Sequence, residues 1–70
     1  MLSASDVEQI LEAGGSVKIP ALAPEMLIQL AEVAKNFGVR LEIEAQGLSP
    51  ESMRKIAKAG AGHVFFDLTG

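Results

Sequence analysis

The chain has 70 residues, a net charge of −3 and no cysteine. Its length allows one domain spanning residues 1–70, and the lack of thiols excludes disulfides and thiolate metal sites. The acidic balance argues against nucleic acid, whose binding draws on clustered Lys and Arg. With one histidine, a zinc site would need carboxylates or a second subunit to complete it. We therefore expect no nucleic-acid partner and no cofactor.

Membrane and secretory segments are not expected either. No apolar run approaches the ~18 residues that a membrane-spanning helix requires. The first residues lack the basic stretch followed by an apolar stretch that marks a secretory signal. These features predict a soluble, cytoplasmic protein with no membrane partner. Its core must be aliphatic, because the chain has 3 Phe and no Trp or Tyr.

The first predicted helix starts at Ser3 or Ser5, each of which has an acidic residue three positions later, as in a capping box. It ends at Gly14, and a strand is predicted over residues 16–19, with Lys18 on its polar side. The apolar stripe of this helix, at helical spacing, comprises Val7, Ile10 and Leu11.

The second predicted helix begins at Pro24, because the missing N–H of proline costs nothing at the first helical position. It ends before Gly38, and a strand is predicted over residues 39–44. The inward face of the helix comprises Leu27, Leu30, Ala31 and Ala34, with Met26, Val33 and Phe37 beside it. The strand alternates between an apolar side with Val39, Leu41 and Ile43 and a charged side with Arg40, Glu42 and Glu44.

The third predicted helix has Ser49 as its N-cap and Pro50 at its first position, and it closes at Ala59-Gly60. A last strand is predicted over residues 63–68. The inward residues of this helix are predicted to be Met53, Ile56 and Ala57. The strand alternates between Val64, Phe66 and Leu68 on one side and His63, Phe65 and Asp67 on the other. A leucine before each helix start has hydrophobic-staple spacing, at Leu2, Leu22 and Leu48.

These elements predict a two-layer α/β fold. Strands joined through helices are parallel, and their right-handed crossovers place every helix on one face. The alternation of apolar and charged side chains indicates that one face of the sheet is buried and the other is open. We predict a three-stranded parallel sheet with three helices on one face, an αβαβαβ repeat. Strand orders 1-2-3 and 2-1-3 both remain open, and residues 39–44 are favoured as the central strand.

The open face of the sheet is the candidate interaction surface. It is either a solvated face with cross-strand ion pairs or a docking surface, and an exposed Phe among charges favours docking. Unpaired sheet edges also favour association. We expect a small, non-catalytic interaction or regulatory module that docks a protein partner or forms a homo-oligomer. The surface comprises Lys18, Arg40, Glu42, His63, Phe65 and Asp67.

Small-ligand binding or a minimal enzyme remains as an alternative, with a site around His63, Asp67 and Glu42. Histidine titrates near neutrality, and a carboxylate could orient it. Ligands of parallel α/β sheets bind beyond the carboxyl ends of the strands. That rim is nearly bare of nucleophiles, bases and metal ligands here, so we expect no catalysis. The rim comprises residues 20–22, 45–47 and 69–70.

Two further motifs have structural explanations. Gly60-Ala61-Gly62 follows a helix and precedes a strand, which is the reverse of a phosphate loop, so it is predicted to stop the helix. A basic face on the third helix complements the helix dipole or docks an acidic partner. That face comprises Arg54, Lys55 and Lys58. A purely structural repeat without any ligand is a third possibility.

Residues 27–43, 48–51 and 59–60 carry a resemblance to a known family. From Gly15 to Leu68 the chain resembles the later part of a STAS domain, the module of anti-sigma-factor antagonists and of related transporter subunits. The segments are similar to the second helix, the next strand and the final helix of that family. Its opening strands have no counterpart, and its phosphorylatable Asp-Ser falls near Pro20-Ala21-Leu22, which has no hydroxyl. The resemblance therefore implies docking to a partner protein without the phosphorylation switch.

A second resemblance concerns residues 41–67, which are similar to a βαβ unit of several phosphoribosyl-binding barrels. A chain of 70 residues is too short to close such a barrel. The barrel fragment stays a rival to the STAS resemblance.

Overall fold

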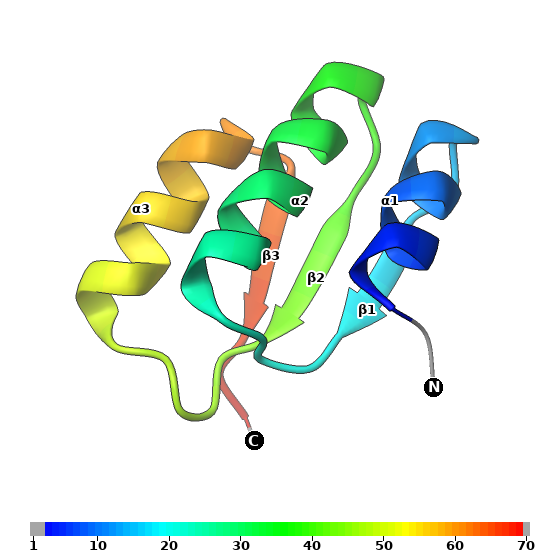
Figure 1. The fold of residues 1–70 in the computed structure, drawn as a ribbon. Coiled ribbons are helices and arrows are strands. Elements are labelled where there is room, and N and C mark those ends of the chain that lie inside the picture. The colour runs from blue at the N-terminus through cyan, green and yellow to red at the C-terminus, as the bar shows by residue number, and fades with distance from the viewer. Residues whose placement is uncertain (1–2, 70) are drawn as a thin grey trace.

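The structure is a computed structural model and describes residues 3–69. Its single parallel sheet has the strand order β1-β2-β3. Figure 1 shows the three helices side by side over one face of this sheet. The predicted fold is confirmed, as is the central position of the strand near residues 39–44. The elements are α1 (Ala4–Glu12), β1 (Val17–Ile19), α2 (Pro24–Phe37), β2 (Leu41–Glu44), α3 (Pro50–Gly60) and β3 (Val64–Asp67).

The strands begin later than predicted, although the ladder extends beyond them. β2 starts at Leu41 and β3 at Val64. The N–H of Val17 still donates to the carbonyl of Arg40 at 3.2 Å, and the N–H of Leu41 donates to His63 at 2.9 Å. Arg40 and His63 are therefore held in line with the strands that follow them, and strand alternation puts their side chains on the open face.

The helix starts follow the local sequence. Ser3 is the N-cap of α1, because its Oγ accepts the N–H of Asp6 at 3.2 Å while Asp6 Oδ2 accepts the N–H of Ser3 at 3.1 Å. Ser49 caps α3 by accepting the N–H of Ser52 at 3.1 Å. Leu22 and Leu48 pack against the core, and Leu2 lies outside the described residues.

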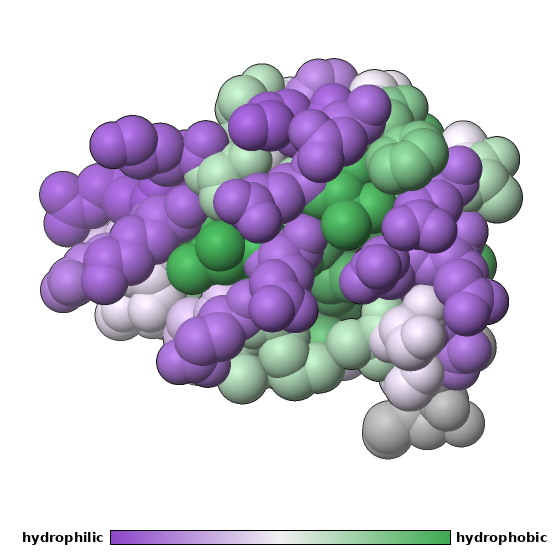
Figure 2. Space-filling view, turned by 45° about the horizontal axis from the view of Figure 1, so that its top comes forward, coloured by the Kyte–Doolittle hydropathy of each residue, from purple (hydrophilic) through white to green (hydrophobic). Residues whose placement is uncertain are grey.

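The core lies between the helices and the inner face of the sheet. All four residues predicted for the inward face of α2 are buried. Figure 2 shows hydrophilic side chains along the outer surfaces of the helices and hydrophobic residues in the furrows between them. This amphipathic pattern leaves the apolar side of each helix for the core. The largest fully buried side chains are Leu11, Leu27, Leu30, Leu41, Ile43 and Ile56.

Two inward predictions are wrong. Ala57 is exposed, because the buried line of α3 runs through Ile56 and Gly60, one turn apart, and Ala57 lies about 100° round the helix from Ile56. Leu68 is 74% exposed, because β3 ends at Asp67 and the alternation of the strand ends with it.

The end of α3 also differs from the prediction. Gly60 is the last helical residue and is buried, while Ala61 takes the left-handed conformation with φ 46°. A Cβ at position 60 would overlap the side chain of Val64 and lie 3.4 Å from the Cβ of Ala31. Gly60 is therefore required for the close approach of α3 to β3 and α2, and not for a left-handed stop.

Candidate functional site

The open sheet face carries the six side chains predicted for it, and the structure divides them into two groups. Lys18 pairs with Glu42 in the strand register, and Glu42 pairs with Phe65, so these three share one row across the sheet. Lys18, Glu42 and Asp67 form an ion-paired cluster. Arg40, His63 and Phe65 line a pocket at the amino end of the strands.

The ion-paired cluster spans the whole width of the sheet. Lys18 Nζ lies 2.9 Å from Asp67 Oδ2 and 3.7 Å from Glu42 Oε2. Lys18 is on β1 and Asp67 is on β3, so the lysine side chain crosses the central strand to reach its partner. Cross-strand ion pairing thus occupies one half of the open face.

Asp67 is held as a carboxylate by several donors. The hydroxyl and the N–H of Thr69 both donate to Oδ1, the N–H at 3.0 Å, and Lys18 donates to Oδ2. These bonds, those from Thr69 first, hold the pKa of Asp67 well below its usual range. The bond to Asp67 raises the pKa of Lys18 in turn. A carboxylate so stabilised is a poor general base at neutral pH.

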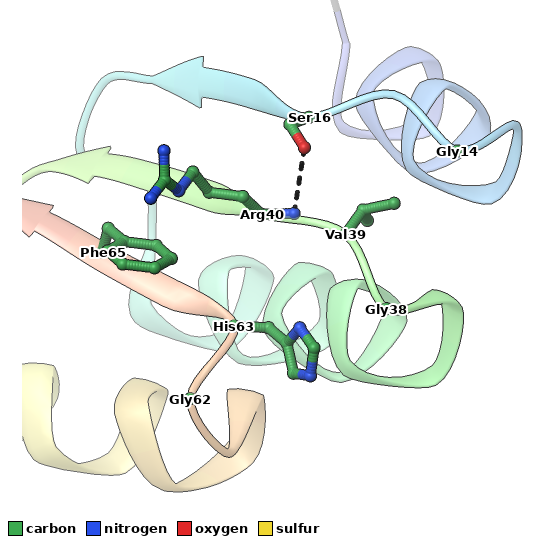
Figure 3. A pocket seen from close by; sticks show the side chains of 8 residues that line it. All are labelled: Gly14, Ser16, Gly38, Val39, Arg40, Gly62, His63 and Phe65. Atoms are coloured by element: carbon green, nitrogen blue, oxygen red, sulfur yellow. Dashed lines mark hydrogen bonds between the residues drawn. The ribbon is translucent and has the colours of Figure 1, made fainter.

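The second group surrounds a depression of about 450 Å³ at the amino end of the strands. The guanidinium of Arg40 lies over the ring of Phe65, 4.0 Å from its centroid. Ser16 Oγ accepts the N–H of Arg40 at 3.1 Å. Figure 3 shows this bond, the stacked Arg40 and Phe65 side chains, and the His63 ring turned away from Phe65. The lining residues are Gly14, Ser16, Gly38, Val39, Arg40, Gly62, His63 and Phe65.

The structure does not bring together the residues of the predicted alternative site. His63 precedes β3 and Asp67 ends it, so they lie roughly 13 Å apart at about 3.3 Å per residue. Asp67 and Glu42 bond with Lys18, whereas His63 lies in the pocket with Arg40. The arrangement gives His63 no carboxylate to orient it as a general base within the described residues.

The carboxyl rim of the sheet is bare of reactive groups in the part that the structure describes. Thr69 is engaged with Asp67, and Gly70 lies outside the described residues. Within residues 3–69, no three His, Asp or Glu side chains are placed to hold a metal ion. No helix in that range is both long and apolar enough to cross a membrane.

Sequence reasoning missed the pocket at the amino end. Ser16, Arg40 and His63 each stand immediately before an aligned strand residue, which is Val17, Leu41 or Val64. The recurrence of a polar residue at the same place in each repeat was the available signal. Ligands of parallel sheets ordinarily bind at the opposite rim, beyond the carboxyl ends of the strands, so a site at the amino end was not expected.

No protein-family model, no curated protein and no solved structure matches this chain.

Proposed function

We propose that this chain is a small, non-catalytic interaction module, regulatory in role and cytoplasmic, that docks a protein partner through its open sheet face. The partner is either a foreign chain or a second copy. The observation that carries the proposal is Phe65, which is 41% exposed on the sheet face opposite the three helices. The resemblance to STAS domains implies the same general role.

Phe65 has the properties of an interface anchor. Large aromatic side chains and arginines dominate the binding energy of protein interfaces. The Arg40 guanidinium stacked on the ring restricts both side chains before binding, so less conformational entropy is lost when a partner covers them. An ordered, exposed aromatic side chain therefore supports docking better than an ordinary solvated face would.

The charges around Phe65 fit the same role. Interfaces commonly have an apolar centre and a polar rim. Glu42 and Lys18 share the row of Phe65, Asp67 lies two residues further along β3, and Arg40 stacks on the ring. The Phe65 ring is thus surrounded by charged side chains, and these charges favour a specific partner over nonspecific aggregation.

Site-specific photo-crosslinking in cells tests the proposal. A photoreactive benzoylphenylalanine replaces Phe65 in one variant and Phe37, 51% exposed at the end of α2, in a matched control. We expect a discrete adduct from position 65, identified by mass spectrometry as a foreign chain or as a second copy, that is absent from position 37. Adducts that are equal at the two positions, or absent from both, would contradict docking through the open face.

A second candidate function is the binding of a small anion in the pocket at the amino end. The Arg40 guanidinium, the His63 ring and the Ser16 hydroxyl line the same depression, and arginine suits carboxylates and phosphates. Titration with inorganic phosphate, followed by the NMR signals of the His63 ring, tests it. Saturable shifts that Arg40→Gln abolishes would favour this candidate, whereas linear shifts equal in both proteins would exclude it.

A further inference from the structure

The charges of the open face are separated along the strand direction. Arg40 and His63 precede β2 and β3 at the amino end of the sheet. Glu44 and Asp67 end the same two strands and are aligned with each other in the register. The face is therefore basic at one end and acidic at the other, with Phe65 between them.

Within one copy, the charges at the two ends of β2 are not neutralised by ion pairs. Lys18 pairs with Glu42 and Asp67, but neither Arg40 nor Glu44 has an ion-pair partner within residues 3–69. Glu44 is exposed and stands beside Asp67, and like charges placed opposite each other on neighbouring strands are unfavourable. A surface that brings a cation to Glu44 and an anion to Arg40 would relieve this arrangement.

A second copy of the chain supplies both. We propose that the open face docks on itself, sheet against sheet, about a twofold axis that runs across the strands through the row of Lys18, Glu42 and Phe65. This proposal rests on the proposed function and identifies its partner. The rotation reverses the strand direction and keeps each strand over its own equivalent. Arg40 then faces the partner's Glu44, while Lys18, Glu42 and Phe65, which lie on the axis, each face their own equivalent in the partner.

The charges at the two ends of the face favour this axis over a twofold axis parallel to the strands. An axis parallel to the strands would place Arg40 against the partner's Arg40 and Glu44 against the partner's Glu44. The crosswise axis forms the Arg40–Glu44 contact twice, as symmetry requires of two self-complementary surfaces. It also brings His63 over the partner's Asp67.

The size of the face makes this a weak dimer. Three strands about 4.8 Å apart and three or four residues long, at about 3.3 Å per residue, give a contact of roughly 15 by 13 Å, or about 200 Å². That is well below the ~800 Å² per partner of a stable interface. We expect a dissociation constant in the high micromolar range or above, so the association must be measured at the millimolar concentrations used for NMR.

Charge reversal tests the register directly. The molecular mass and the translational diffusion of the wild type, Arg40→Glu and Glu44→Arg are followed up to millimolar concentration. Each reversal changes two symmetry-related contacts from attraction to repulsion, so we expect each to weaken the dimer by at least about tenfold. Lys58→Glu on α3 and Glu25→Arg on α2 are controls with the same changes in net charge, and circular dichroism verifies the fold of every variant.

Two further samples distinguish the axes. An equimolar mixture of Arg40→Glu and Glu44→Arg should form a heterodimer, because its facing charges at positions 40 and 44 are all opposite. The double variant R40E/E44R should dimerise again by itself, because the crosswise axis pairs Glu at position 40 with Arg at position 44. Recovery in both samples supports the proposal. Association that strengthens in the mixture alone, with neither single reversal weaker than the wild type, indicates the axis parallel to the strands and overturns the proposal.

Two other outcomes also overturn the dimer. A wild type that stays monomeric at millimolar concentration shows that the face does not bind itself. A wild-type dimer that neither reversal weakens, and that the mixture does not strengthen, uses another surface. In the first case the docking function still stands if position 65 crosslinks to a foreign chain in cells. In the second case, docking through the open face is contradicted as well, unless such an adduct is found.

Discussion

Lys18 and Asp67 are 49 positions apart in the chain and lie on the two outer strands, yet their side chains bond at 2.9 Å above the central strand. The bond fastens the two edges of the open face to each other. Because both side chains are partly exposed, water and salt weaken this bond, and its contribution depends on the protonation of Asp67.

Asp67→Asn should destabilise the protein in a pH-dependent manner. The pKa of Asp67 is lowered on folding, so its contribution is fully present above the ordinary value of 3.8 and is lost as pH falls below it. Urea unfolding at about pH 7 should show the wild type as the more stable, and at about pH 3 the difference should shrink. Glu42→Gln, at the longer distance of 3.7 Å from Lys18, serves as the comparison and should have the smaller effect. A difference that is constant across this range would contradict the role of the ionised carboxylate.

Gly60→Ala should destabilise the protein even though alanine favours helices. The added Cβ overlaps the side chain of Val64, and overpacking typically costs about 1–3 kcal/mol, which exceeds the ~1 kcal/mol gained in helix propensity. Denaturant unfolding measures the change in the free energy of unfolding. Adding Val64→Ala should recover part of the loss, since it removes the atoms that clash. Simple additivity of the two losses would argue against that contact.

Ala61→Gly should stabilise the protein. Ala61 has φ 46°, a conformation that costs an L-residue about 1–2 kcal/mol relative to the right-handed one and costs glycine little. The greater entropy lost by glycine on folding offsets part of this, so we expect a net gain of about 0.5 kcal/mol. Ala57→Gly, at an exposed position within α3, is the control and should lose about 1 kcal/mol. Thermal unfolding of the two variants should therefore shift in opposite directions.

Phe65→Asp should leave the fold intact, whereas Phe66→Asp should abolish it. Phe65 is exposed on the open face, and Phe66 packs against the core. An exposed substitution costs at most about 1 kcal/mol, mostly through the low strand propensity of aspartate. A carboxylate placed against the core has no partner and costs far more. Circular dichroism and the dispersion of NMR signals compare the two, and unfolding of Phe65→Asp would show that Phe65 has a structural role.

Much of the fold was predictable because the capping residues and the hydrophobic pattern of each segment favour the same helix or strand that the tertiary structure contains. Pro24, Ser49 and the alternation of Leu41 to Glu44 each predict the element that the structure contains. The buried face of α2 follows from helical spacing alone. Strand orders 1-2-3 and 2-1-3 were both open, and the structure confirms the favoured placement of residues 39–44 at the centre.

What could not be predicted depends on tertiary contacts. Gly60 reads as a helix stop, and only the approach of Val64 and Ala31 shows that its missing side chain is the requirement. The bond of Asp67 with Lys18 across the central strand depends on the flexible reach of the lysine side chain, which no spacing in the sequence encodes. The pocket beside Arg40 forms where connections from all three repeats meet, and each contributes only two or three residues to it.

The order β1-β2-β3 has a consequence for how the chain folds. Most contacts between elements join a helix or strand to its counterpart in the next repeat, α1 with α2, β1 with β2, α2 with α3 and β2 with β3. Such an arrangement grows by neighbour-to-neighbour addition, as in solenoids, and short loop closures make it fast. We expect α2 and β2 to form the nucleus, since they alone have a neighbour on both sides. For the same reason, an additional helix–strand unit could extend the sheet at either edge without changing the path of the rest of the chain.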